Sequence, residues 1–160
     1  LLDTYEVPSQ HRAMSEVTRF WAQHDPSIVT KPAAPGECNG QPIPLKDLPK
    51  NVLEPDCIRP SGCLWCEHHR DIDSEDYLWS LACFRHLKII EVSVWTPPKD
   101  QARETHPAQR VVDRITDKLR WFRESNERRR EWVEEALARV EEGNYHPDWT
   151  RRIRATGASA

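Results

Sequence analysis

The sequence lacks the apolar segments that direct a chain into a membrane or out of the cell. No apolar run approaches the roughly 20 residues that a membrane-spanning helix needs, and no signal-peptide pattern is visible. We therefore expect a cytoplasmic location and no membrane partner. The 160 residues begin with leucine rather than methionine, so we also expect a fragment of a longer protein.

An even number of cysteines and an excess of positive charge are missing as well. Five cysteines cannot all pair, which argues against a secreted disulfide scaffold and favours metal ligands in a reducing compartment. The net charge of −3 argues against a chain that wraps nucleic acid with its whole surface. Only the residues after Asp100 are slightly basic, with thirteen basic and eleven acidic side chains.

Apolar residues recur at helical spacing, which predicts a mainly α fold: a small helical domain with a zinc knuckle and a C-terminal helical hairpin. Ser74 is expected to cap a buried central helix, although its tail, IIEVSVW, could instead form a short strand. The hairpin is expected to break at Ser125–Asn126, with one long helix through Asn126 as the alternative. The expected organisation is an N-terminal helix in 1–30, a proline-rich zinc-knuckle segment in 31–72, the central helix in 73–96, the hairpin in 105–150 and a flexible tail in 151–160.

The segment before the central helix is dense in proline. Seven prolines lie within residues 27–60, a density that forbids a long helix or a central strand. Such a segment has little core of its own. Metal binding can supply about 10 kcal/mol or more of folding free energy, so a metal would explain how it becomes ordered.

Four cysteines follow the spacing C-x18-C-x5-C-x2-C: Cys38, Cys57, Cys63 and Cys66. A C-x2-C turn lets two thiolates face one point, and Gly62 before it is expected to permit an unusual backbone angle. Four thiolates suit a tetrahedral Zn²⁺ site, which is closed to substrate and therefore structural. The same ligand set could hold an iron–sulfur centre.

Other ligand sets remain open. His68 or His69 could replace Cys38 as the fourth ligand, because both directly follow the C-x2-C pair. Cys83 and His86 could complete a second knuckle with that pair, C-x2-C-x16-C-x2-H. The alternative for Cys83 is a small apolar residue in the core of the central helix.

Several strings together resemble one family. PDCIRPSGCLWCEHH, followed by DSEDYLWSL, resembles the cysteine-rich region after the catalytic domain of a group of bacterial tyrosine recombinases, the phage and mobile-element integrases. GECNG upstream and YHPDWTRRI near the end are similar to pieces of the same region, in the same order. The resemblance spans about Tyr5 to Ile153. It implies an accessory zinc-binding domain in the bacterial cytoplasm that acts in DNA recombination and integration, with DNA as partner.

The same resemblance implies a role for Tyr5, because the nucleophile of these enzymes lies near the end of the catalytic domain. That tyrosine attacks a DNA phosphodiester and forms a 3′-phosphotyrosyl link. The chain contains no H-x-x-R box and no upstream arginine and lysine elements. Tyr5 is otherwise an ordinary terminal tyrosine, and the chain alone is expected to be inert because a nucleophile needs that electrostatic clamp.

Two arginine clusters are candidates for phosphate contact. In NERRREW the arginines interleave with glutamates, which is typical of a solvated helix face. Arg151, Arg152 and Arg154 have fewer acidic neighbours and are the predicted DNA contacts.

Three functions follow from these observations. The first is the accessory domain of a DNA integrase, which contributes DNA binding or protomer assembly through self-association. The second is a zinc-stabilised protein–protein interaction module without a DNA role. The third is a metal-dependent enzyme that uses His68, His69 and the nearby acidic residues; four protein ligands on the metal would exclude it.

Overall fold

The computed structural model describes residues 31–38, 40–97, 99 and 105–157, which divide into two compact units. We call residues 31–48 and 53–72 the cysteine unit, and residues 49–52 and 73–157 the helical unit. The helix expected within residues 1–30 lies outside the described residues. The predicted mainly helical class is confirmed.

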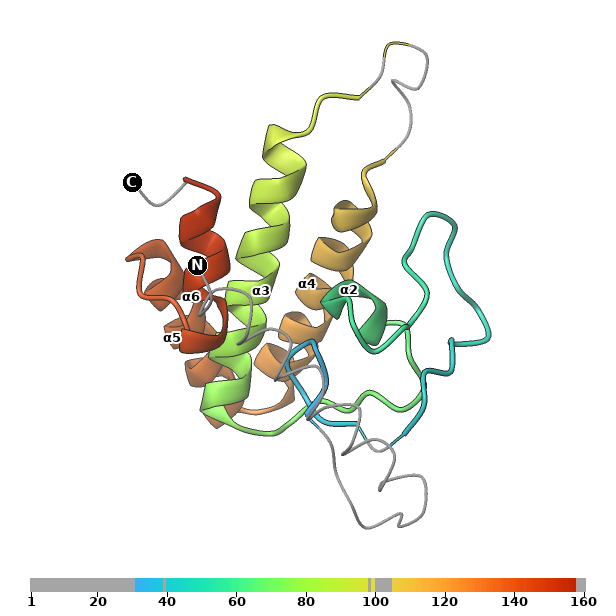
Figure 1. Cartoon of the computed structure of the whole chain (residues 1–160). Helices are drawn as coiled ribbons and strands as arrows, with labels where there is room; N and C mark the ends of the chain where they lie inside the picture. Colours follow the sequence, from blue (N-terminus) through green and yellow to red (C-terminus); the bar gives the residue numbers. More distant parts are fainter. Residues whose placement is uncertain (1–30, 39, 98, 100–104, 158–160) are drawn as a thin grey trace, which may run out of the picture. The chain divides into compact units, whose positions relative to one another are not determined.

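The helical unit is built around α3, which spans Glu75–Val94 (Figure 1). Ser74 caps it as predicted, since its side-chain oxygen accepts a hydrogen bond from the Tyr77 backbone N–H at 3.1 Å. The IIEVSVW tail is helical through Val94 and does not form a strand. The buried residues of α3 lie on most of its circumference, as expected for a central helix: Tyr77, Leu78, Ser80, Leu81, Ala82, Cys83, Phe84, Leu87 and Ile90.

Helices α4 and α5 form the predicted hairpin against α3. α4 spans Pro107–Ser125 and α5 spans Glu127–Glu141, and each packs on α3 and on the other. Asn126 separates them, because its backbone is extended and its side chain caps α5 by accepting from the Arg129 N–H at 2.8 Å. The alternative of one continuous helix is therefore wrong.

The flexible tail expected over residues 151–160 is helical up to Ala155. α6 spans Pro147–Ala155, and its buried residues Trp149 and Ile153 hold it against α3. The Trp149 ring stacks on Phe84 with centroids 4.7 Å apart, and its Nε1 donates to Ser80 Oγ at 2.9 Å. These contacts with α3 order the segment that its arginine-rich sequence had suggested was loose.

Two helices of this unit begin with the same dipeptide. His106 precedes Pro107 in α4, and His146 precedes Pro147 in α6. Each histidine accepts the backbone N–H two residues on through Nδ1, at 3.0 and 3.1 Å. Proline suits the first helical position, since its missing N–H would have no helical partner there. The pair HP thus acts as a helix start in both places.

No helix in the described parts of the chain combines the length and apolar composition needed to cross a bilayer.

Candidate metal centre

The cysteine unit is held by backbone pairing between two segments that are distant in sequence. Glu37 and Arg70 exchange both backbone hydrogen bonds, at 2.9 and 2.7 Å. Further along, Leu45 N–H donates to Trp65 O at 2.9 Å, and Glu67 N–H donates to Ile43 O at 2.8 Å. This antiparallel pairing brings the segment that carries Cys38 alongside the C-x2-C turn.

The C-x2-C turn follows a four-residue helix, α2, which spans Pro60–Cys63. Cys66 N–H donates to Cys63 O at 3.2 Å, which closes the turn. The role expected for Gly62 is corrected here, since it serves close packing and does not need a left-handed backbone angle. A Cβ at Gly62 would lie 2.7 Å from Glu54 O, too close for any side chain.

Cys57 has a strained backbone conformation. Its φ is 62°, in the left-handed region that residues other than glycine seldom adopt. The preceding Asp56 carboxylate stabilises the turn, because it accepts from the backbone N–H groups of Ile58 and Arg59 at 2.9 and 2.8 Å. Strain of this kind persists where the surroundings enforce it, and here it sets the direction of a thiol.

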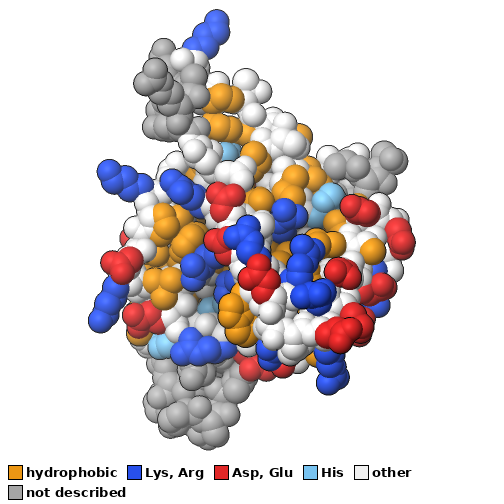
Figure 2. Space-filling view, turned by 180° about the vertical axis from the view of Figure 1, so that it is seen from behind, with side chains coloured by type: hydrophobic (Ala, Val, Ile, Leu, Met, Phe, Trp, Pro, Cys, Tyr) orange, Lys and Arg blue, Asp and Glu red, His pale blue; other side chains and the backbone are white. Residues whose placement is uncertain are grey.

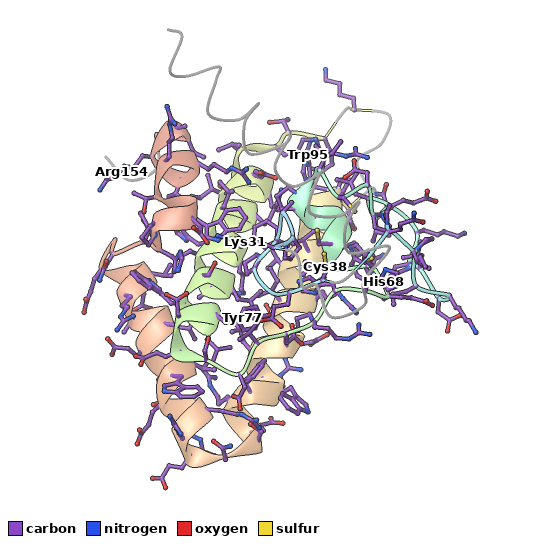
Figure 3. The ribbon with its side chains drawn as sticks, turned by 60° about the horizontal axis from the view of Figure 1, so that its bottom comes forward. Lys31, Cys38, His68, Tyr77, Trp95 and Arg154 are labelled. Carbon is purple, nitrogen blue, oxygen red and sulfur yellow. The ribbon has the colours of Figure 1, made fainter. Side chains whose placement is uncertain are left out.

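All four cysteines predicted as ligands line one small cavity. Two histidines and three further residues complete its walls: His68, His69, Pro32, Gly40 and Pro55. Figure 3 labels Cys38 and His68 of this group. The cavity volume is about 20 Å³, slightly above the roughly 10–15 Å³ that one water-sized sphere occupies. The cavity is therefore about large enough for one ion.

The side chains are not already arranged as a coordination shell. Among the described residues, no group of three or more His, Cys, Asp or Glu side chains has the geometry to hold a metal ion. No disulfide joins any of the five cysteines, all of which are described. Without a disulfide in the structure, the thiols could act as ligands, and metal binding would need them to close on the cavity.

The surroundings of Cys63 bear on its ionisation. Burial raises the pKa of this thiol to about 11, even though the backbone N–H groups of Ala33 and Ala34 hydrogen-bond its sulfur and lower the pKa. The nearby Cys57 and Cys38 raise it further by like-charge repulsion. A cation in the cavity would remove this repulsion, and the two N–H donors would stabilise the thiolate.

Both histidines use one ring nitrogen on a backbone carbonyl. His68 Nδ1 lies 2.6 Å from Gln41 O, and His69 Nε2 lies 2.6 Å from Pro35 O. A Cβ at Gly40 or Gly36 would come within 2.7 Å of these rings. Glycine is thus required at two positions where the loop crosses the histidines. These contacts fit two roles for the histidines. The rings could simply pack the loop, or the carbonyl contact could orient each ring so that its other nitrogen binds a metal.

Cys83 and His86 do not line this cavity; they belong to α3 in the helical unit. Cys83 is fully buried and its sulfur accepts a hydrogen bond from the His146 N–H at 3.3 Å. The His86 ring stacks on Tyr145 with centroids 5.4 Å apart. Both side chains have packing roles, which matches the core interpretation of Cys83.

The predicted DNA contacts lie in the helical unit. Arg151, Arg152 and Arg154 are exposed on α6, where Arg154 is labelled in Figure 3. The Arg152 guanidinium lies over the Trp149 ring at 5.2 Å. Tyr5, the candidate nucleophile, lies outside the described residues. On the face drawn in Figure 2, basic and acidic side chains interleave instead of forming single-sign patches.

Sequence reasoning missed the residues around the thiols. The N–H donors of Ala33 and Ala34 have no side-chain signal. Gly36 and Gly40, in contrast, flank Cys38 within GECNG, and glycines beside a candidate ligand were a usable sign of close packing.

In comparisons with protein-family models, curated proteins and solved structures, nothing matches the chain.

Proposed function

We propose that the chain is an accessory domain of a DNA-integrating protein, in which Cys38, Cys57, Cys63 and Cys66 hold one structural Zn²⁺. The observation that carries the proposal is the convergence of these four thiols on one ion-sized cavity. Three of them lie within ten residues, whereas Cys38 comes from the paired segment. Four protein ligands leave no open position, so the metal would stabilise the fold and take no part in catalysis.

DNA contact is assigned to α6 because its three arginines lie within the four residues 151–154, with few acidic neighbours. On α5, Arg129 forms a bidentate pair with Asp73 at 2.8 and 2.9 Å, and Arg139 pairs with Glu135 at 3.1 Å. Within the described residues, none of Arg151, Arg152 and Arg154 forms an ion pair. Unpaired guanidinium groups can neutralise DNA phosphates without first breaking a protein contact.

The zinc part is tested by metal analysis of the purified full chain. We expect one zinc and no iron per chain, with loss of zinc in Cys38→Ser and Cys63→Ser. Cys83→Ala is the matched control and should keep the metal. If Cys38→Ser keeps its zinc and His68→Ala loses it, the fourth ligand is His68 and not Cys38.

The DNA part is tested by fluorescence anisotropy with a labelled duplex across a salt series. The triple variant R151Q/R152Q/R154Q should lower the salt slope by roughly 1 for each lost phosphate contact. The variant R110Q/R128Q/R130Q removes the same charge from exposed positions of α4 and α5 and is the control. Equal loss in both variants would mean that net charge alone drives binding.

A protein-interaction module is the second candidate, favoured by exposed apolar side chains on the helical unit. Trp121 is 60% exposed and Val94 is 75% exposed. An interaction module would bind no duplex at any salt concentration. Absence of DNA binding by a zinc-loaded chain would therefore favour this function over the first.

A further inference from the structure

A second cavity lies in the helical unit, at a junction of α3, α4 and α5. It is lined by Arg85 from α3, by Leu137 from α5 and by four α4 residues: Thr116, Leu119, Arg120 and Arg123. The α4 residues are spaced three and four apart and so share one helix face. Its volume is about 210 Å³, smaller than the roughly 300–1,000 Å³ of sites for drug-sized ligands.

Arg85 is the fixed element of this cavity. Its Nε donates to Thr116 Oγ1 at 2.9 Å, and Thr116 Oγ1 in turn donates to Val112 O at 2.7 Å. Within the described residues no carboxylate pairs with Arg85, and burial lowers the pKa of its guanidinium. A half-buried cation without a counter-charge is costly, and an anion beside it would offset that cost.

The other two arginines add positive charge at the rim. Arg120 and Arg123 are exposed, and Arg120 makes one contact with Asp117 at 3.3 Å. That pair is solvent-exposed on both sides and therefore weak. None of the described residues that line the cavity is acidic. Leu119 and Leu137 are apolar, and the cavity they line is less polarisable than open water, which strengthens an ionic contact.

We propose that this cleft binds a phosphate group through Arg85, Arg120 and Arg123. The guanidinium fork matches two oxygens of a phosphate, and three such groups can surround one tetrahedral anion. Leu119 and Leu137 limit the cleft to a compact group. The ligand is either a free phosphate anion or a phosphate of a DNA backbone, and both have the same recognition chemistry.

The test uses the full chain in low-salt buffer without phosphate. Inorganic phosphate is titrated while the arginine Nε–Hε signals are followed by NMR, with acetate at equal ionic strength as a second titration. We expect saturable shifts of Arg85, Arg120 and Arg123 with phosphate. Arg123→Gln should weaken binding about tenfold or more, since it removes a charge-assisted contact. Arg110→Gln, also exposed on α4 but outside the cavity, should leave it unchanged.

A duplex oligonucleotide forms the other arm of the experiment, and this arm alone rests on the proposed DNA function. Shifts of the same three arginines with the duplex, reversed by excess phosphate, would assign the DNA backbone as the source. Shifts with inorganic phosphate only would support a free anion, whatever the outcome of the DNA and zinc tests. Arg85→Lys with unchanged melting temperature should also weaken binding, because lysine lacks the fork.

The proposal is overturned if neither phosphate nor duplex shifts these signals, or if all exposed arginines shift together without saturation. Equal binding of acetate would also overturn it, in favour of a carboxylate partner. The proposal is also overturned if folded Arg123→Gln binds phosphate with the same affinity as Arg110→Gln.

Discussion

The two units of this chain are stabilised in different ways. In the helical unit, the interior is filled by large side chains from four helices, with Phe84, Leu78 and Ile115 fully buried. In the cysteine unit, the buried apolar residues of the described chain are few: Ala34, Pro35, Cys63, Leu64 and Trp65. Backbone pairing joins the two segments of that unit instead, and its cysteines line the cavity proposed to bind zinc. The proline-rich segment is thus ordered without a helical core of its own.

Removal of the proposed zinc should affect the cysteine unit far more than the helical unit. Chelation of the zinc-loaded chain, or Cys63→Ser, should abolish hydrogen-exchange protection of the Glu37 and Arg70 amides, since structural zinc supplies about 10 kcal/mol or more. Amides in α3 should stay protected because helical packing does not depend on the thiols. Hydrogen exchange with mass spectrometry measures both. Unchanged protection of the cysteine unit after chelation would contradict the structural-zinc proposal.

Truncation of a core side chain should destabilise the helical unit and leave the cysteine unit unaffected. Phe84→Ala should lower the free energy of unfolding of the helical unit by about 3–5 kcal/mol, because Phe84 is fully buried and stacks on Trp149. Zinc content should not change. Thermal and urea unfolding followed by circular dichroism measures the change in stability, and metal analysis measures the zinc content. The control, Val94→Ala, removes an exposed side chain and should change stability by about 0.5 kcal/mol or less.

Acid should affect the cysteine unit before the helical unit. Zinc binds the thiolate, whereas burial raises the pKa of the Cys63 thiol to about 11 without metal, so binding must release its proton. The metal therefore stabilises more as pH rises and is lost as pH falls. Each proton released corresponds to about 1.4 kcal/mol per pH unit. Zinc competition titrations between pH 6 and 8 should show at least a tenfold change per unit, and a pH-independent affinity would refute the assignment.

The smallest expected effect is the difference in stability between variants of the two histidines that precede α6 and α4. His146→Ala should destabilise the helical unit by about 1–2 kcal/mol, since it removes the α6 cap. It also removes the Nε2 contact with Asp76 at 3.1 Å. His106→Ala removes a cap of the same geometry from α4. The His106 ring is only half-buried, so its loss should lower the free energy of unfolding by less. Urea unfolding of both variants makes the comparison, and equal losses would contradict the larger contribution expected of His146.

Local signals in the sequence were sufficient for much of the helical unit. Ser74 and Asn126 are side-chain caps whose chemistry acts within three residues, and both positions were predicted. The α4 stripe of Val111, Ile115 and Leu119 is buried as its spacing predicts. The extent of α6 was missed because its order depends on contacts of Trp149 and Ile153 with α3, far away in sequence.

The candidate site divides in the same way. The spacing of Cys57, Cys63 and Cys66 is a local property, readable as a ligand pattern. The meeting of Cys38 with them depends on the pairing of Glu37 with Arg70, which spacing cannot reveal. The arginine-lined cleft is a further case. Arg85 and Arg123 are ordinary polar positions in sequence, and only the packing of α3 against α4 places them around one cavity.

Helix type, caps and ligand chemistry follow from neighbouring residues, because hydrogen bonds and side-chain spacing act over one or two turns. Convergence of distant groups follows from packing and long-range backbone pairing, since loop closure joins residues that share no local pattern. The amino-acid sequence was therefore enough to identify a mainly helical chain with candidate metal-binding thiols. The cavity that they share, and the cleft between the helices, required the fold.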